Sequence, residues 1–389
     1  MTRFIIGLTG AFGSGTSFIA KNFFETKGYK LLSLSQCLKD LYKEKNGKTY
    51  ETRSELQQFG NDIRKENITK LAEIVDEKID DNSNYIIESI RNPAEVKFFR
   101  DKYTEFILIG IFADYDVRWE RVKKIYKESK DMFNIDEQKD QGKMEPYYGQ
   151  KISDCFFEAD LILSNNDRII CKGDGYNEAN DKYYEMESKI NGYLIALNNP
   201  AKSSPTLVEA SMAAAYTSGR RSKCLKRKVG AVITDKYDKI ISSGFNGVPN
   251  NLKECSSQYG HCYRDEMRTE LGELISKDLE LSSSSKSVEA IKKRVKLLEL
   301  CRAMHGEESA IINLVGKGIN MENSTIYVTT YPCNLCANKI VQTGIKKVIY
   351  FEPYPVEEAK KTLKDGNVKS EPFEGVTFRA FFKFFQYEP

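Results

Sequence analysis

The sequence has little of several features that would each mark a particular class of protein. Only two histidines occur, His261 and His305, so any chemistry that needs an imidazole must use one of them. Lysine and arginine exceed aspartate and glutamate by only three charges, which is too few to indicate a polynucleotide partner. No apolar run approaches the ~20 residues that span a bilayer. We therefore expect a soluble globular protein with no membrane partner.

We also expect no export signal. The apolar stretch Phe4–Leu8 near the N-terminus is short and no small-residue cleavage site accompanies it, so we interpret it as a first β-strand. Nine cysteines in such a chain predict reduced thiols in the cytoplasm, some of them bound to metal.

Hydrophobic periodicity divides the 389 residues into two α/β domains. In the first part, the apolar runs Phe4–Leu8, Tyr85–Glu88 and Glu105–Phe112 alternate with polar helical stretches, which predicts a parallel sheet covered by helices. A polar stretch with prolines at 198–205 predicts the boundary. We expect one domain over residues 1–200 and another over residues 206–389. In the second domain we expect strands at Val229–Thr234, Lys239–Gly244, Thr325–Thr329, Lys347–Phe351 and Val376–Phe384, and helices at Met267–Leu281 and Val288–Met304.

A glycine-rich turn follows the first strand and opens a helix, the context in which the backbone amides of a P-loop hold nucleotide phosphates. The P-loop pattern requires lysine at the position of Thr16, so the charge that contacts the outer phosphates is missing. We predict nucleotide binding or regulation in preference to hydrolysis, with Ser17 available to bind Mg²⁺. A scaffold that binds no nucleotide is the alternative. The candidate nucleotide-binding residues are Gly10, Gly13, Ser14, Gly15, Thr16 and Ser17.

The most informative pattern combines His305 and Glu307 with Cys333 and Cys336. Zinc binds imidazole and thiolate groups, and a catalytic zinc site uses three protein ligands with the fourth position open to water. A Cys-x-x-Cys pair that opens a helix can place both sulfurs on one ion, and the helix N-terminus favours the thiolate form. For the cysteines alone, a redox pair or half of a structural zinc site is the alternative. The combined pattern is the signature of zinc nucleobase deaminases.

In this pattern His305, Cys333 and Cys336 are the ligands and Glu307 is the proton carrier. Bound zinc lowers the pKa of water from ~15.7 towards ~7 and so supplies a hydroxide at neutral pH. Glu307 takes the water proton and delivers protons to the ring nitrogen and the departing amino group while hydroxide attacks C4 of a pyrimidine. The predicted products are a uracil base and ammonia.

The segments Ser222–Ile233 and Gly244–Pro249, taken with the zinc motif, resemble the deoxycytidylate deaminase family. The family pattern has a basic pair before Val-Gly-Ala-Val-Ile and then Gly-Tyr-Asn-Gly-x-Pro. The resemblance implies a cytidine-deaminase-like three-layer α/β/α domain and a free deoxycytidine nucleotide, dCMP or dCTP, as substrate. It also implies that Asn246 contacts the deoxyribose, that Arg227 lies near the phosphate and that Tyr331 lines the pocket.

Two positions depart from the family pattern. Gly306 stands where alanine is usual, and Ser309 where asparagine is usual. The insertion at about 267–304 is also longer than in small members of the family. These departures leave the choice between a monophosphate and a triphosphate open.

A second metal site is a further hypothesis. Cys255, His261, Cys262 and Cys301 are residue types that bind zinc, and the first three lie in one short segment before the catalytic motif. Some relatives of the family have a similar Cys and His-Cys pair. Ordinary buried thiols are the alternative interpretation.

The segment Ile86–Pro93 resembles the carboxylate-bearing strand of nucleoside monophosphate kinases, so the first domain looks like a P-loop kinase-like fold. A domain of this kind before a deoxycytidylate deaminase domain is similar to the bacterial antiviral cytidine deaminases. That resemblance implies depletion of deoxycytidine nucleotides during phage infection and inhibition by a small RNA. We also expect a regulatory nucleotide and a homo-oligomer.

Two other functions remain alternatives. A deaminase that edits cytosine or adenine in RNA or single-stranded DNA would have clustered basic and aromatic residues beside its pocket, and the sequence has no clear stripe of them. A P-loop NTPase or nucleotide-binding regulator would make the deaminase half secondary, and Thr16 counts against hydrolysis.

Overall fold

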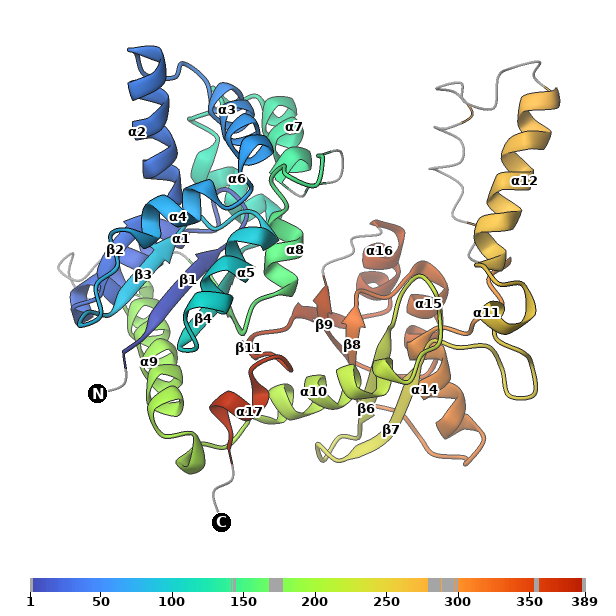
Figure 1. Ribbon diagram of the computed structural model, residues 1–389. Helices are drawn as coiled ribbons and strands as arrows, with labels where there is room; N and C mark the ends of the chain where they lie inside the picture. Colours follow the sequence, from blue (N-terminus) through green and yellow to red (C-terminus); the bar gives the residue numbers. More distant parts are fainter. Residues whose placement is uncertain are drawn as a thin grey trace. The chain divides into compact units, whose positions relative to one another are not determined.

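The computed structural model describes residues 3–140, 142, 145–167, 178–278, 288, 297, 300–352 and 357–386. The chain forms two compact units, which are described separately (Figure 1). The first combines Met1–Pro205 with Glu374–Pro389, and the second is Thr206–Phe373. Among the described residues, none of the helices is long and apolar enough to cross a membrane.

The first unit contains a six-stranded sheet with the order β11-β5-β4-β1-β3-β2. Strands β1 to β5 run parallel, and β11 is antiparallel to β5. Because helices cover such a sheet on both faces, its strands are continuous apolar runs, as the sequence predicts. The strands are β1 (Ile5–Thr9), β2 (Lys30–Ser33), β3 (Tyr85–Glu88), β4 (Phe106–Phe112), β5 (Leu161–Ser164) and β11 (Gly375–Val376).

The strand order reverses at β1, because β2 and β3 lie on one side of it and β4 and β5 on the other. In open α/β sheets ligands bind beyond the carboxyl ends of the strands at such a reversal. The loop after β1, which contains the P-loop residues, lies at that edge. The helices of this unit are α1 (Thr16–Ile19), continued by the π-helix η1 (Ala20–Phe24), α2 (Leu34–Asn46), α3 (Arg53–Glu66), α4 (Lys70–Asp76), α5 (Pro93–Lys102), α6 (Tyr115–Val122), α7 (Lys130–Asp140), α8 (Ile152–Phe157) and α9 (Glu178–Asn198).

The C-terminal segment differs from the prediction, which placed it in the second domain as a strand over Val376–Phe384. Strand β11 ends at Val376, and Phe381–Phe384 forms the short helix α17. Phe384 is buried in the core of the first unit, and the Thr377 hydroxyl donates to the Ala159 carbonyl at 2.8 Å. The aromatic content of the segment favoured a strand, because aromatic residues are common in strands. The phenylalanines at 381, 384 and 385 nevertheless have helical spacing.

The second unit contains a five-stranded sheet with the order β10-β9-β8-β6-β7. Helix α10 (Leu207–Arg220) covers one face, where the ring centroids of Tyr216 and Phe351 are 5.2 Å apart. Helices α14, α15 and α16 share a core with alternate strand residues on the opposite face, such as Ile326 and Val328. The predicted three-layer α/β/α architecture is therefore confirmed. The strands are β6 (Gly230–Thr234), β7 (Ile240–Phe245), β8 (Thr325–Thr330), β9 (Lys347–Glu352) and β10 (Lys369–Pro372).

The remaining helices of this unit are α11 (Cys255–Gln258), α12 (Tyr263–Asp278), α14 (Gly306–Val315), α15 (Asn334–Gln342) and α16 (Glu357–Asp365). Helix α12 begins four residues before the predicted start at Met267 and extends away from the sheet (Figure 1). Most of the helix predicted over Val288–Met304 lies outside the described residues.

Candidate active site

Three side chains from two helix starts converge on one point. His305 is the N-cap of α14, Cys333 is the N-cap of α15, and Cys336 lies in the first turn of α15. Nδ1 of His305 is 3.3 Å from Sγ of Cys333 and 3.4 Å from Sγ of Cys336, and the ligand atoms all lie within 4.8 Å of one another. In a tetrahedral zinc site such atoms are about 3.6 Å apart, as follows from the usual Zn–S and Zn–N lengths. The donor types and their separations therefore fit zinc.

The two cysteines differ in their affinity for a proton. The hydrogen bond with Cys336 is the largest cause that lowers the pKa of the Cys333 thiol, and His305 contributes to the same effect. The same bond and burial raise the pKa of Cys336. Cys333 is thus readily a thiolate, which is the form that binds zinc.

Glu307 lies in the first turn of α14, two residues after His305, and is only 3% exposed. Burial raises its pKa to about 7, while the nearby imidazole of His305 acts in the opposite direction. A carboxyl group with a pKa near the operating pH can both accept and donate a proton. This matches the predicted role of Glu307 as a proton carrier.

Glycines allow the strands to approach the catalytic helix closely. A Cβ at Gly244 would lie 2.4 Å from the Gly306 carbonyl oxygen, and the Ser242 hydroxyl donates to the Ala310 carbonyl at 2.8 Å. A Cβ at Gly306 would lie 2.9 Å from the carbonyl oxygen of Val229. The departure from alanine at position 306 therefore has a steric reason, since that carbonyl occupies the space of a methyl group.

Asn246 is buried and binds two backbone groups. Its Oδ1 accepts from the Val229 N–H at 2.7 Å, and its Nδ2 donates to the Arg227 carbonyl at 2.9 Å. These bonds fix the segment that carries Arg227. A second lone pair and a second N–H remain for another partner, so the contact with deoxyribose stays a prediction beside the backbone role that the sequence did not indicate.

The other two predicted substrate contacts lie in different environments. The Arg227 guanidinium is about half exposed and 3.5 Å from Oε2 of Glu352. Tyr331 is buried in the core, with its ring centroid 4.7 Å from that of Tyr350 and its hydroxyl 3.4 Å from Oγ of Ser370. The structure thus packs the Tyr331 ring on a neighbouring strand, and its role in lining the pocket stays a prediction.

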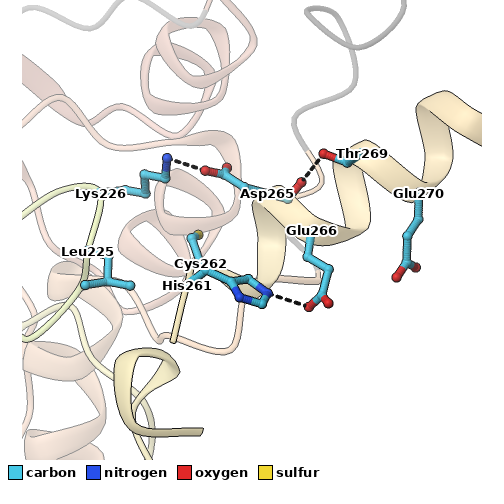
Figure 2. A pocket seen from close by; sticks show the side chains of 8 residues that line it. All are labelled: Leu225, Lys226, His261, Cys262, Asp265, Glu266, Thr269 and Glu270. Carbon is cyan, nitrogen blue, oxygen red and sulfur yellow. Dashed lines mark hydrogen bonds and ion pairs between the residues drawn. The ribbon is translucent and has the colours of Figure 1, made fainter. Parts of the chain in front are cut away.

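The second set of candidate metal ligands, Cys255, His261, Cys262 and Cys301, does not bring three ligand atoms as close together. Within the described ranges, His305, Cys333 and Cys336 form the one group of three whose ligand atoms approach this closely. Nε2 of His261 is instead 3.1 Å from Oε2 of Glu266. Figure 2 shows this pair and the Lys226–Asp265 pair in an open pocket of about 560 Å³. The residues that line it are Leu225, Lys226, His261, Cys262, Asp265, Glu266, Thr269 and Glu270.

In the first unit, the loop after β1 has the backbone of a phosphate-binding turn. Gly13 and Gly15 have φ values of 84° and 92°, which side chains other than glycine rarely adopt. A Cβ at Gly15 would lie 2.4 Å from Nδ2 of Asn165, which donates to the Ser14 carbonyl at 2.7 Å. The Ser17 hydroxyl donates to Glu88. The Ser17 hydroxyl, which the sequence predicts to bind Mg²⁺, is thus engaged by a carboxylate of the protein.

Arg121 of α6 is a residue that the sequence did not single out. Its Nη1 is 3.3 Å from the Gly13 carbonyl oxygen, and its Nη2 is 2.8 Å from the Asn165 carbonyl oxygen. It places a positive charge beside a loop that has threonine in place of lysine. No local signal could have identified it, because α6 follows the loop by about a hundred residues and only the fold brings them together.

The second unit matches a known protein family. The family model of the cytidine and deoxycytidylate deaminase zinc-binding region matches residues 205–352. The deoxycytidylate deaminase of Enterobacteria phage T2 is 34% identical over 145 residues, which are 36% of this chain and 77% of the phage protein. The chain belongs to the deoxycytidylate deaminase family.

Other relatives are matched over smaller shares of their length. The deoxycytidylate deaminase of Saccharomyces cerevisiae is 32% identical over 171 residues, which are 44% of this chain and 43% of the yeast protein. The chain therefore spans less than half the length of that relative.

Two solved structures match different parts of the chain. The dCMP deaminase from the cyanophage S-TIM5, in complex with dCMP and dUMP, has 22% sequence identity and a TM-score of 0.31, and the match covers 44% of this chain and 98% of that one. Shikimate kinase from Bacteroides thetaiotaomicron has 14% identity and a TM-score of 0.32, with 49% and 98% covered.

Proposed function

We propose that this protein deaminates free dCMP to dUMP, with water consumed and ammonia released. The main support is the convergence of one imidazole nitrogen and two cysteine sulfurs beside the buried carboxyl group of Glu307. Membership of the deoxycytidylate deaminase family supports the same conclusion.

His305, Cys333 and Cys336 would hold the zinc ion. When bound, zinc supplies a hydroxide at neutral pH by lowering the pKa of water to ~7. Glu307 then has two tasks at one position. It holds the proton removed from water, and it delivers protons to N3 and to the departing amino group of the cytosine ring. Its burial favours the protonated form that the second task requires.

The 5′ phosphate is the remaining recognition problem. Arg227 is the candidate for this contact, because Asn246 holds its backbone and its guanidinium is about half exposed. Charge-assisted bonds between arginine and phosphate are strong. A phosphate would replace Glu352 as the partner of the Arg227 side chain. Arg227 would then bind the phosphate of either dCMP or dCTP, and we propose both as substrates.

Product analysis with a panel of substrates tests the proposal. The zinc-loaded protein is incubated separately with dCMP, dCTP, CMP, single-stranded DNA and RNA, and the products are identified by mass. We expect dUMP or dUTP from the free deoxynucleotides and no uracil within either polymer. Uracil or inosine formed within a polymer, with free dCMP and dCTP unchanged, would support the editing alternative and contradict the proposal.

The biological setting is proposed on the resemblance in domain order alone. We propose that the cytoplasmic protein depletes deoxycytidine nucleotides during phage infection and that a small RNA inhibits it. We also propose a homo-oligomer and a regulatory nucleotide with Mg²⁺ at the loop after β1, where Gly10–Ser17 supplies the backbone. Nucleotide pools in infected cells with and without the protein would test the depletion, since an unchanged dCTP pool contradicts it.

A further inference from the structure

We infer that Glu308 is a positioning residue for the metal site. It links the start of α14, which carries His305, to α15, which carries Cys333 and Cys336, and so sets the separation of the three ligands. The inference rests on the proposed zinc site and deepens it, since it assigns a role to two residues outside the zinc motif, Glu308 and Lys339.

The two carboxylate oxygens of Glu308 have different partners. Oε2 accepts the backbone N–H of His305 at 3.3 Å, which closes the first turn of α14 around the N-cap residue. Oε1 accepts from Nζ of Lys339 at 2.9 Å. One side chain therefore binds the backbone of one ligand residue and a side chain of the helix that carries the other two.

Lys339 is placed to transmit this link to the sulfurs. It follows Cys336 by three residues on α15, so the two side chains lie on the same side of that helix. Nζ of Lys339 contacts Glu308 at 2.9 Å, so the positive charge lies on the side of α15 that carries Cys336. Through this contact, Glu308 is tied to the first turns of α15, where Cys336 lies.

The ligand residues need this support because two of them lie at helix ends. His305 and Cys333 are N-cap residues with ψ values of 159° and 169°, outside the helical range. The apolar contacts of α14 and α15 with the core, through Ala310, Leu314, Ala337 and Ile340, lie further along the helices. Partly exposed ion pairs contribute little to stability. The Glu308–Lys339 pair therefore acts mainly by fixing the positions of the metal ligands relative to one another. Partners of metal ligands outside the coordination shell typically contribute about 10–100-fold to metal affinity.

The test measures metal binding and not turnover. Zinc affinity is determined by competition with a chromophoric chelator for the wild type and for Glu308→Ala, Glu308→Gln and Lys339→Met. We expect Glu308→Ala to weaken zinc binding about 10–100-fold. Glu308→Gln keeps an oxygen for the His305 N–H, and Lys339→Met keeps that bond intact, so both should bind zinc with affinities between those of Glu308→Ala and the wild type. The absorption bands of the cobalt-substituted proteins should shift in the same order, because they report the ligand angles.

Lys360→Met is the matched control. It removes an exposed lysine that pairs with Glu357 on α16, in the same unit and with the same change of charge. This variant should bind zinc and cobalt as the wild type does. Wild-type affinity and an unchanged cobalt spectrum in Glu308→Ala and Lys339→Met would overturn the inference while leaving the proposed function intact. Wild-type protein that binds no zinc would contradict both.

Discussion

The two units each build a site at the start of a helix, but the sites differ in what their side chains contact. In the second unit, the ligand atoms of His305, Cys333 and Cys336 face one another within 4.8 Å. In the first unit, the loop after β1 has the required backbone, yet Ser17 donates to Glu88 and Asn165 binds the Ser14 carbonyl. A motif thus predicts backbone geometry in both units. The two sites differ because the side chains of the second unit converge on one point, whereas those beside the loop after β1 bind other groups of the protein.

The largest expected effect is at Glu307. Glu307→Gln keeps the shape of the side chain but removes its capacity to carry protons, so kcat for dCMP should fall about 10²–10⁴-fold. The zinc content should stay at the wild-type value, because the ligands are unchanged. Kinetics and metal analysis on the same preparation check both statements. A zinc-loaded variant that keeps wild-type turnover would show that another group moves the proton.

Asn246→Ala should have a smaller effect. It leaves the Val229 N–H and the Arg227 carbonyl without their partner, so Arg227 is no longer held in place. Loss of about 2 kcal/mol of its contact with the phosphate corresponds to about a 30-fold loss of kcat/KM. If Asn246 acts by holding Arg227, the double variant with Arg227→Met should be little worse than Asn246→Ala alone.

Asn313→Ala is the control for Asn246. Asn313 of α14 has an exposed amide that donates to the Ser243 carbonyl of β7 at 3.0 Å. Its removal should change kcat/KM by less than about twofold, as surface substitutions usually cost little. Additive losses in the Asn246 and Arg227 double variant would support a direct contact of Asn246 with the sugar instead.

Restoring the lysine of the P-loop pattern should strengthen nucleotide binding by the first unit. Thr16→Lys supplies the cation that the loop lacks, and a hydrogen bond to a charged group contributes about 1.5–3 kcal/mol, so affinity for a nucleoside triphosphate should rise about 10-fold or more. Binding of a fluorescent ATP analogue measures this. The wild type should hydrolyse ATP and GTP more slowly than about 1 per second. Faster steady-state hydrolysis by the wild type would show that the first unit is also catalytic, which would contradict the difference between the units.

Loss of the hypothetical second zinc ion should have the smallest effect on turnover. If Cys255, Cys262 and Cys301, with His261, bind a structural zinc, the wild type contains two zinc ions per chain and Cys255→Ser contains one, while deamination changes by less than about twofold. Elemental analysis decides, and a single zinc ion in active wild-type protein contradicts the hypothesis. In the structure Nε2 of His261 contacts Glu266, so this zinc would have to displace that contact.

The sequence predicted local features well. The ligands of the zinc site follow from residue types and spacing, and the buried strands of the first sheet follow from apolar runs. The features that it did not predict depend on contacts between distant segments. Phe384 joins the core of the first unit although it follows the second, and Val229 explains why position 306 lacks a methyl group.

The sequence predicted the contacts of the substrate-binding residues less completely than the metal ligands. The motif with Asn246 indicated a polar group near the substrate, but spacing carries no information about backbone partners, so its bonds to residues 227 and 229 were not foreseen. Tyr331 adjoins the zinc motif in the sequence, yet its side chain extends into the core. Glu308 and Lys339 belong to different helices, and only the fold brings them within hydrogen-bonding distance.

Metal removal and return test the central claim most directly. Wild-type protein is stripped with a chelator, dialysed and given back one equivalent of zinc, and the formation of dUMP and ammonia from dCMP is followed at each stage. We predict no turnover by the stripped protein and recovery with zinc in the wild type but not in Cys333→Ser. Turnover of dCMP by the stripped protein at the initial rate, or full recovery in Cys333→Ser, would contradict the account.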